Sequence, residues 1–333
     1  MVAFRRILAV CLALILSIAP AGAALAPGSI PAAFDELLKV PTLSNPAMIV
    51  IDGSTGQIIY EKNIYSQRKP ASVMKVLAGA VTLEYLDPQS VFNTTINIAS
   101  EEKIVVIRGS LDPWISLDHN VARKMKRASL PYMGFNTLSA IKKANGGSLK
   151  NYKVIYSNLY SKDVANLKAF WAKRGFKPTF KSVSPEDAYA AQGELIASEN
   201  SPTVVEILDW MMLWSDNTLA DRLARLSARA AGYSFDFKGV DTIFRELLTR
   251  FEIDHSKLVV VDASGLSKKN KITAKEIAIY FNKLLNVEGV VDKYCKNGLQ
   301  VCSDNTREIK KIGFAVDACM ASFELASATG CDM

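Results

Sequence analysis

Apolar positions in the first third of the chain predict a hairpin followed by a buried helix. Two short β-rich runs at 47–52 and 57–62 flank a turn at 53–56 that contains glycine at both ends, which is the pattern of a β-hairpin. Proline at position 70 then opens an apolar run that continues to about residue 86, and proline is favoured in the first turn of a helix. Because this run is apolar on nearly every side, the helix is expected to be buried.

Helical periodicity returns after Pro202, beyond a middle region of different character. Residues 91–185 contain turn residues and short strand-like pieces such as 104–107, and we interpret them as an inserted small subdomain. An apolar run at 258–261 predicts one more strand. Helix-like spacing of apolar residues predicts further helices at 31–38, 204–213, 219–231, 240–251 and 274–285.

The N-terminus has the pattern of a secretory signal peptide. Arg5 and Arg6 precede an apolar stretch at 7–18, and small residues follow at 21–23. The stretch is shorter than the ~20 residues that a membrane-spanning helix needs, although an uncleaved anchor stays open as an alternative. We therefore expect a signal peptide at 1–23 and an exported, extracytoplasmic mature protein.

Composition and charge narrow the range of functions. With 49% hydrophobic residues the mature chain should be globular, and with a net charge of +7 it should be basic. Outside the cytoplasm the counterparts of a basic protein are anionic wall polymers and membrane surfaces rather than nucleic acid, although a generally solvated basic surface explains the charge more simply. His119 and His255 are the only histidines, and no glycine-rich phosphate loop is present, so no metal or cofactor is expected.

Cysteines crowd the C-terminal tail and are absent from the body of the mature chain. Four of the five are Cys295, Cys302, Cys319 and Cys331, and the fifth, Cys11, lies in the expected signal peptide. In an oxidising compartment the four could form two disulfides in three possible pairings. A truncated or out-of-frame C-terminus would give the same pattern, and both readings stay open.

Ser72 and Lys75 are the first candidates for chemistry. Their spacing places a hydroxyl and an amine on one face at the start of the buried helix. Desolvation disfavours an ammonium group and can lower the pKa of a lysine toward neutrality, and a neutral amine is a general base for a serine nucleophile. The alternative is a snorkelling lysine beside an ordinary helix-start serine. The same Ser-x-x-Lys pattern also begins at Ser66, Ser100 and Ser139, but none of these serines opens a buried helix.

A second candidate is the Ser215-Asp216-Asn217 sequence between two predicted helices. A serine or asparagine there is often only a helix cap. The Ser-x-Asn pattern also recurs at Ser198 and Ser303, so context has to decide its meaning.

Three blocks taken in order resemble the signature of the penicillin-binding D-Ala-D-Ala carboxypeptidases that carry inserted domains. The blocks are residues 70–75, 215–220 and 262–267. The resemblance implies an α+β, transpeptidase-like fold, in which an antiparallel sheet is flanked by helices and an all-helical part carries the reactive residues. It also implies one catalytic domain from 24–90 and 186–333, with 91–185 inserted.

The resemblance further implies residue roles and partners. Ser72 would be acylated by the penultimate D-alanine carbonyl of a peptidoglycan stem peptide, with Lys75 as its base. Ser215 would relay a proton to the leaving D-alanine, and Asn217 would hold the substrate's side-chain amide. Ser264 and Gly265 look structural, and β-lactam antibiotics would act as acylating inhibitors. Whether carboxypeptidation, endopeptidation or transpeptidation dominates is left open.

One departure from the family is the missing Lys-Thr/Ser-Gly strand, which supplies a lysine for the substrate carboxylate and an oxyanion donor. Residues 296–298, 311–313 and 328–330 are poor substitutes. Loss of one oxyanion donor costs about 3 kcal/mol of transition-state stabilisation. The rival of an active carboxypeptidase is therefore a catalytically impaired relative that binds penicillin or peptidoglycan. A β-lactamase or esterase would need a deacylating base that the sequence does not reveal.

Overall fold

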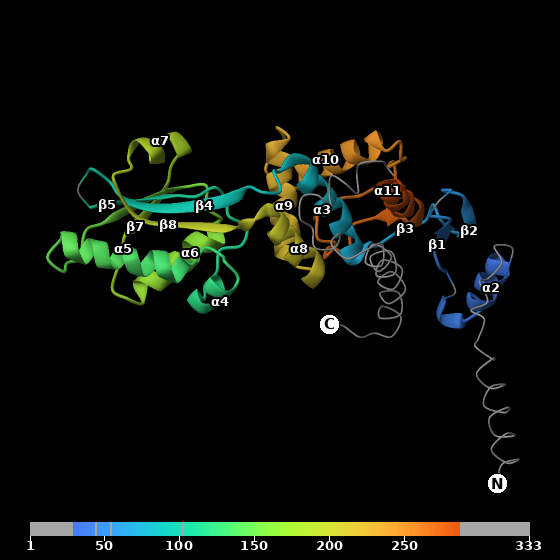
Figure 1. Cartoon of the computed structure of the whole chain (residues 1–333), viewed down its shortest axis with the longest axis horizontal. Coiled ribbons are helices and arrows are strands. Elements are labelled where there is room, and N and C mark those ends of the chain that lie inside the picture. The colour runs from blue at the N-terminus through green and yellow to red at the C-terminus, as the bar shows by residue number, and fades with distance from the viewer. Residues whose placement is uncertain (1–28, 44, 54, 102, 287–333) are drawn as a thin grey trace, which may run out of the picture.

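The structure, a computed structural model, describes residues 29–286 except residues 44, 54 and 102. The described part is elongated and has a sheet-containing lobe at one end and a helical lobe at the other (Figure 1). The expected signal peptide at 1–23, the tail cysteines and the three substitutes for Lys-Thr/Ser-Gly all lie outside the described residues.

The helical lobe is built around α3 (Met74–Tyr85), which packs against α8 (Val204–Trp214), α9 (Asn217–Ala230) and α10 (Phe237–Arg250) (Figure 1). Leu77 and Val81 of α3 are fully buried in the core cluster that these helices share. Apolar residues around all sides of α3 explain this central position, since each side meets another helix. The predicted buried helix is confirmed, although a short 3-10 turn at Ala71–Val73 precedes the α-helix.

Small antiparallel strand pairs complete the helical lobe. The predicted hairpin is confirmed as β1 (Met48–Ile51) paired with β2 (Ile58–Lys62). β3 (Gln67–Arg68) pairs with β9 (Ile272–Thr273). The helices at this end are α2 (Ile30–Leu37), which packs on β2, and α11 (Ala274–Asn286), which packs on β1, with a 3-10 turn at Pro41–Leu43.

The other lobe contains a mixed five-stranded sheet in the order β7-β6-β5-β4-β8. β4 is antiparallel to both of its neighbours, whereas β5, β6 and β7 run parallel. The strands are β4 (Val91–Ile98), β5 (Ile104–Arg108), β6 (Lys153–Ser157), β7 (Thr179–Ser182) and β8 (Glu194–Thr203). The helices are α4 (His119–Lys124), α5 (Leu130–Ala144), α6 (Ser161–Ala172) and α7 (Pro185–Ala190).

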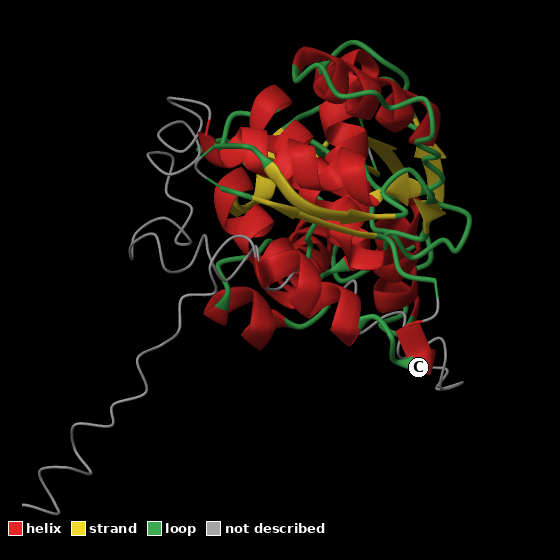
Figure 2. Ribbon diagram, turned by 90° about the vertical axis from the view of Figure 1, so that its right-hand side faces the viewer, coloured by secondary structure: helices red, strands yellow, loops and turns green. Residues whose placement is uncertain are grey.

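Helices cover both faces of this sheet, which has its own core. α5 and α6 lie on one face and α7 on the other (Figure 1), and Figure 2 shows strands with helices above and below them in the view along the long axis. Trp171 and Phe176 are fully buried and stack edge to face at 5.2 Å in the larger core cluster. The combination of helices and sheets confirms the α+β class. Among the described residues, the five-stranded sheet of this lobe is mixed, and the two strand pairs of the helical lobe are antiparallel.

Two details differ from the sequence-based expectations. The sheet continues past residue 185, because β8 pairs along the length of β4 and so belongs to the same lobe. The strand expected at 258–261 is wrong, since Val259 makes only an isolated bridge to Lys271. The backbone amides of Val261 and Asp262 instead donate to the Asn270 side chain, at 2.7 and 3.3 Å, which takes the place of a partner strand. The five helices predicted elsewhere are confirmed to within three residues at each end.

Candidate active site

Ser72 lies in the 3-10 turn that leads into α3. The preceding residue, Ala71, has a left-handed backbone with φ of 47°, an uncommon conformation for a residue with a β-carbon. The amide of Val73 closes the turn by donating to the Pro70 carbonyl at 3.1 Å. The hydroxyl of Ser72 is thereby placed at the N-terminus of the buried helix, where the helix dipole favours negative charge.

Lys75 begins the buried part of α3, and only 2% of its surface is exposed. Its Nζ lies 3.2 Å from the Ser72 Oγ and 2.6 Å from the Asn217 Oδ1. The same nitrogen lies 2.9 Å from the backbone carbonyl of Ser264. Lys75 is therefore a buried lysine held by three oxygen partners, and the snorkelling alternative is wrong.

Ser215 approaches Ser72 from the end of α8. Its Oγ donates to the Ser72 Oγ at 2.9 Å. Ser215 is the C-cap of α8 and has φ of 53°, so the chain turns sharply there before Asp216 caps α9 by accepting from the Leu219 amide at 3.0 Å. The structure thus brings together all four residues predicted from the sequence, Ser72, Lys75, Ser215 and Asn217, from the 3-10 turn, α3, the end of α8 and the start of α9.

The Ser264 carbonyl was missed from the sequence, which gave this residue only a structural role. It is presented by a loop in which the Asp262 carboxylate accepts from the backbone amides of Gly265 and Ser267, both at 2.6 Å. The Asp221 carboxylate of α9 accepts from the amides of Ala263 and Ser264, both at 3.0 Å. The signal was present in the density of Asp, Ser and Asn around 262–270, residue types that form such side-chain-to-backbone bonds.

Gly265 is required by a close approach of two backbone segments. Its φ is 82°, and a β-carbon there would lie 1.5 Å from the carbonyl oxygen of Ala71, far inside contact distance. The structural role expected for Gly265 is confirmed. The contact joins the loop that carries the Ser264 carbonyl to the turn that carries Ser72.

A second buried polar cluster lies where the two lobes meet, and its members are Asp112, Tyr160, Asp163 and Arg222. Arg222 of α9 donates to the Pro113 carbonyl at 2.8 Å, lies 3.6 Å from the Asp163 carboxylate, and stacks 4.0 Å from the Tyr160 ring centre. Asp112 is only 1% exposed, and one of its oxygens accepts from the Trp114 amide at 2.7 Å. We call this group the inter-lobe cluster.

Burial is the main cause of the raised pKa values of the two carboxyl groups in the inter-lobe cluster. Burial, together with the nearby Asp163 carboxylate, raises the pKa of Asp112 to about 7, although the hydrogen bond from the Trp114 amide and the charges of Arg127 and Arg222 act in the opposite direction. Burial likewise raises the pKa of Asp163, although Arg222 counteracts this. One carboxyl of the cluster is therefore protonated over part of the neutral range.

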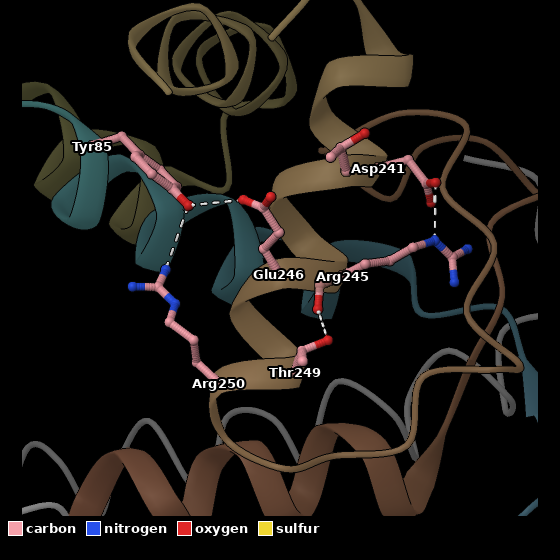
Figure 3. A pocket seen from close by; sticks show the side chains of 7 residues that line it. Tyr85, Asp241, Arg245, Glu246, Thr249 and Arg250 are labelled. Carbon is pink, nitrogen blue, oxygen red and sulfur yellow. Dashed lines mark hydrogen bonds and ion pairs between the residues drawn. The ribbon is translucent and has the colours of Figure 1, made fainter. Parts of the chain in front are cut away.

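An open groove of about 600 Å³ lies elsewhere, between α3 and α10 (Figure 3). Tyr85 lines it and lies ten residues beyond Lys75, about 15 Å along the helix axis. Its charged residues are paired, as Arg245 with Asp241 at 2.9 Å and the Tyr85 hydroxyl with Glu246 at 3.3 Å (Figure 3). Because these side chains are already bonded to one another, they are less suited to binding a ligand. The surroundings of Ser72 are therefore the better candidate site.

The histidines do not serve as a base for Ser72. His119 contacts the Ser129 hydroxyl at 3.0 Å, and His255 contacts the Thr249 hydroxyl at 2.9 Å. Among residues 29–286, apart from the three omitted positions, no group of histidine, cysteine and acidic side chains could hold a metal ion. No helix within the described part is long and apolar enough to cross a membrane.

Solved structures with a similar fold support the architecture. The crystal structure of penicillin binding protein 4 (dacB) from Haemophilus influenzae matches with a TM-score of 0.55 and 16% identity, over 78% of this chain and 79% of that one. The same protein complexed with a novel beta-lactam matches with a TM-score of 0.56, again at 16% identity, over 82% and 81%. The described part of the chain therefore has the transpeptidase-like fold of the penicillin-binding proteins.

Within that class, the chain belongs to the D-Ala-D-Ala carboxypeptidase 3 (S13) family, whose model matches residues 30–139 and 154–287. Carboxypeptidase DacB of Mycolicibacterium smegmatis is 27% identical over 277 residues, which cover 70% of this chain and 60% of that protein. The chain thus spans 60% of the length of this curated relative. Residues 272–333 also match a model described as Duf34/NIF3 (NGG1p interacting factor 3), and most of that segment lies outside the described residues.

Proposed function

We propose that this protein is a serine-type D-Ala-D-Ala carboxypeptidase that acts on peptidoglycan stem peptides through an acyl-enzyme on Ser72. The observation that carries the proposal is the continuous set of contacts from Ser215 to Ser72, from Ser72 to Lys75 and from Lys75 to Asn217. Membership of the S13 family supports the same activity.

Lys75 is proposed as the base because it is buried beside the nucleophile. Its Nζ lies 3.2 Å from the Ser72 Oγ, within reach of the proton that the attack releases. The Asn217 Oδ1 and the Ser264 carbonyl, at 2.6 and 2.9 Å, hold the Nζ in this place. Burial favours the neutral form of an amine, which is the form that can accept a proton. The amine would take the Ser72 proton while Ser72 Oγ forms a bond to the carbonyl carbon of the penultimate D-alanine.

Ser215 is proposed as the proton relay to the leaving group. Its hydroxyl already contacts the Ser72 oxygen at 2.9 Å, so it lies beside the bond that breaks. The proton held by Lys75 would pass through Ser215 to the nitrogen of the leaving D-alanine, and water would then hydrolyse the ester by the reverse route. Asn217 binds Lys75 through Oδ1, which leaves its amide NH₂ to contact the substrate's side-chain amide.

The proposed setting is outside the cytoplasm, following export directed by residues 1–23. Stem peptides would be the substrate and β-lactams the acylating inhibitors, as the beta-lactam complex of the Haemophilus influenzae protein suggests for this fold. The net charge of +7 is suited to a location near anionic wall polymers or a membrane surface.

Intact-protein mass spectrometry after incubation with penicillin tests the proposal. We expect one added penicillin on the unmodified chain and none on Ser72→Ala. Ser139→Ala is the matched control, because Ser139 begins another Ser-x-x-Lys sequence but is exposed on α5, and it should label normally. Label on a different residue would overturn the assignment of Ser72.

The rate of labelling separates the enzyme from the impaired relative. Because the sequence lacks an identifiable Lys-Thr/Ser-Gly element, we expect slow acylation, and a family-like C-terminus should raise the rate about a hundredfold or more. No label in either form, on folded protein, would favour a binding protein over an enzyme.

A further inference from the structure

Trp214 presents a large apolar surface directly beside the proposed catalytic centre. It is the last residue of α8, it immediately precedes Ser215, and 63% of its surface is exposed. Consecutive Cα atoms are about 3.8 Å apart, so the backbone of Trp214 adjoins that of Ser215, whose hydroxyl contacts Ser72. Exposed tryptophan is uncommon on a surface without a binding role, since its burial by a ligand contributes a large apolar area.

Two further tryptophans extend this surface toward the other lobe. The Trp214 ring centre lies 5.3 Å from that of Trp210, one turn earlier on α8, and Trp210 lies 5.2 Å from Trp114. Trp114 lies in the segment that follows β5, and both Trp114 and Trp210 are partly buried against the core of the helical lobe. We call Trp214, Trp210 and Trp114 the tryptophan strip, and it leads from Ser215 across the junction of the two lobes.

Polar groups border the strip. The Arg127 guanidinium lies 4.4 Å from the Trp114 ring centre, and it is held there by the carbonyls of Trp114, at 2.7 Å, and Ile115, at 3.3 Å. Burial lowers the pKa of Arg127, and the carboxylates of Asp112 and of Asp216, which is next to Ser215, oppose this. The strip therefore combines flat apolar faces with a fixed cation and a carboxylate at its edge.

This combination fits a carbohydrate better than a purely apolar ligand. A pyranose ring has a flat face of C–H groups that packs on an indole, and hydroxyl and amide groups around its edge that need polar partners. A wholly apolar ligand would instead desolvate Arg127 and Asp216 without replacing their hydrogen bonds to water. A peptide of a few residues spans about 10–14 Å, so a sugar attached to a peptide that reaches Ser72 falls within reach of the strip.

We propose that the tryptophan strip is a carbohydrate subsite, in which Trp214 and Trp210 hold an amino-sugar ring of the glycan that carries the stem peptide. The proposal rests on the proposed function and extends it from the peptide to the sugar. It makes Trp214 a specificity-determining residue, since substrates that carry sugar would bind more tightly than the bare peptide.

The test measures binding to the full chain carrying Ser72→Ala, so that no turnover interferes. The probes are a bare pentapeptide ending in D-Ala-D-Ala, the same peptide on its disaccharide, and tetra-N-acetylchitotetraose without peptide, each followed by calorimetry and tryptophan fluorescence. We expect the disaccharide to tighten peptide binding about tenfold, the scale of one good aromatic contact. Trp214→Ala should abolish that gain and the binding of chitotetraose.

Leu213→Ala is the matched control, because Leu213 is the neighbouring residue on α8 and is 77% exposed. It should keep the sugar-dependent gain. The subsite is overturned if the disaccharide adds no affinity, or if Leu213→Ala loses as much as Trp214→Ala. The chitotetraose arm separates the two proposals: sugar binding that depends on Trp214 without penicillin labelling of Ser72 would leave the subsite standing and the carboxypeptidase proposal refuted.

Discussion

The chain buries two polar clusters along the same helix, and they are satisfied in opposite ways. At the start of α9, Asn217 belongs to the cluster around Lys75, whose amine meets three oxygen partners. One turn later, Arg222 belongs to the inter-lobe cluster, where Asp112, Tyr160 and Asp163 each keep a buried oxygen without a hydrogen-bond partner among the described residues. The first cluster holds the side chains around Lys75 in place, whereas the incompletely hydrogen-bonded groups of the second destabilise the fold.

This difference shows that one helix, α9, can contribute both to a fixed arrangement around Lys75 and to a cluster whose protonation changes with pH. A fully bonded buried network holds its members in one geometry, which suits a nucleophile that must be aligned. A network whose buried carboxylates are only partly hydrogen-bonded has a protonation state that depends on pH and on the packing of the groups around it. Asp221, between the two, ties α9 to the Ser264 loop, so movement at the lobe junction would reach the Lys75 cluster through less than two turns of α9.

The largest expected effect concerns the base at the centre of the bonded cluster. Lys75→Arg should abolish acylation by penicillin, a loss of a hundredfold to ten-thousandfold, because a guanidinium stays charged and cannot accept the Ser72 proton. The labelling rate by mass spectrometry is the measurement. Lys142→Arg, the matching change in the Ser139 sequence, should label normally, and unchanged labelling of Lys75→Arg would remove Lys75 from the mechanism.

Removing the cation of the inter-lobe cluster should lower the free energy of unfolding. Arg222→Met leaves the buried Asp163 carboxylate without its ion-pair partner, so the free energy of unfolding should fall by about 3–5 kcal/mol. Urea unfolding followed by circular dichroism measures this. Arg229→Met, on the exposed side of the same helix, should change stability by less than about 0.5 kcal/mol. Equal losses in the two variants would mean that the cluster is not the source.

Gly265→Ala tests the backbone contact that holds the bonded cluster together. The added β-carbon would collide with the Ala71 carbonyl, and residue 265 would hold an unfavourable φ. We therefore expect the free energy of unfolding to fall by about 3 kcal/mol and the labelling of Ser72 to slow. Gly232→Ala is the control, because Gly232 has φ of 88° and open space around it, and it should lose only about 1 kcal/mol. Similar losses would show that backbone strain alone accounts for the effect.

The smallest expected effect is the pH dependence that Asp112 adds to stability. The pKa of Asp112 is raised in the folded state from 3.8 to about 7, so the folded chain holds a proton that the unfolded chain releases. Its contribution to the free energy of unfolding is therefore largest below pH 4 and falls as the pH rises to about 7, by at least about 1.4 kcal/mol, the equivalent of one pKa unit. The difference in unfolding free energy between the unmodified chain and Asp112→Asn, measured from pH 4 to pH 8, should show this slope. A flat difference would contradict the raised pKa.

Local sequence patterns were enough to predict which side chains lie in the candidate site. Ser72 and Lys75 share a helix face by their spacing alone, and Ser215 and Asn217 occupy a connection between two amphipathic helices that the sequence already predicts. The roles proposed for these four residues remain predictions. The Ser264 carbonyl could not be predicted in the same way, because a backbone oxygen carries no residue identity and its position depends on the loop's hydrogen bonds.

Long-range docking accounts for the remaining differences. Arg222 lies on a helix with a strongly charged sequence, and only the packing of the sheet-containing lobe against α9 buries it. β8 has a polar sequence that ends near a proline, and its strand conformation comes from pairing with β4. The local sequence is a weak guide to both the burial of Arg222 and the conformation of β8, because each depends on contact with a segment far away in the chain.

The pairing of β4 with β8 has a consequence for how such a protein could arise. Val91 lies opposite Thr203 in the ladder, so the chain enters and leaves the sheet-containing lobe at neighbouring points. A segment whose two ends meet can be acquired, shortened or exchanged in evolution without threading through the helices that surround Ser72. The sheet-containing lobe therefore joins the helical lobe at a single place, and it could be replaced by another segment without rebuilding the helices around Ser72.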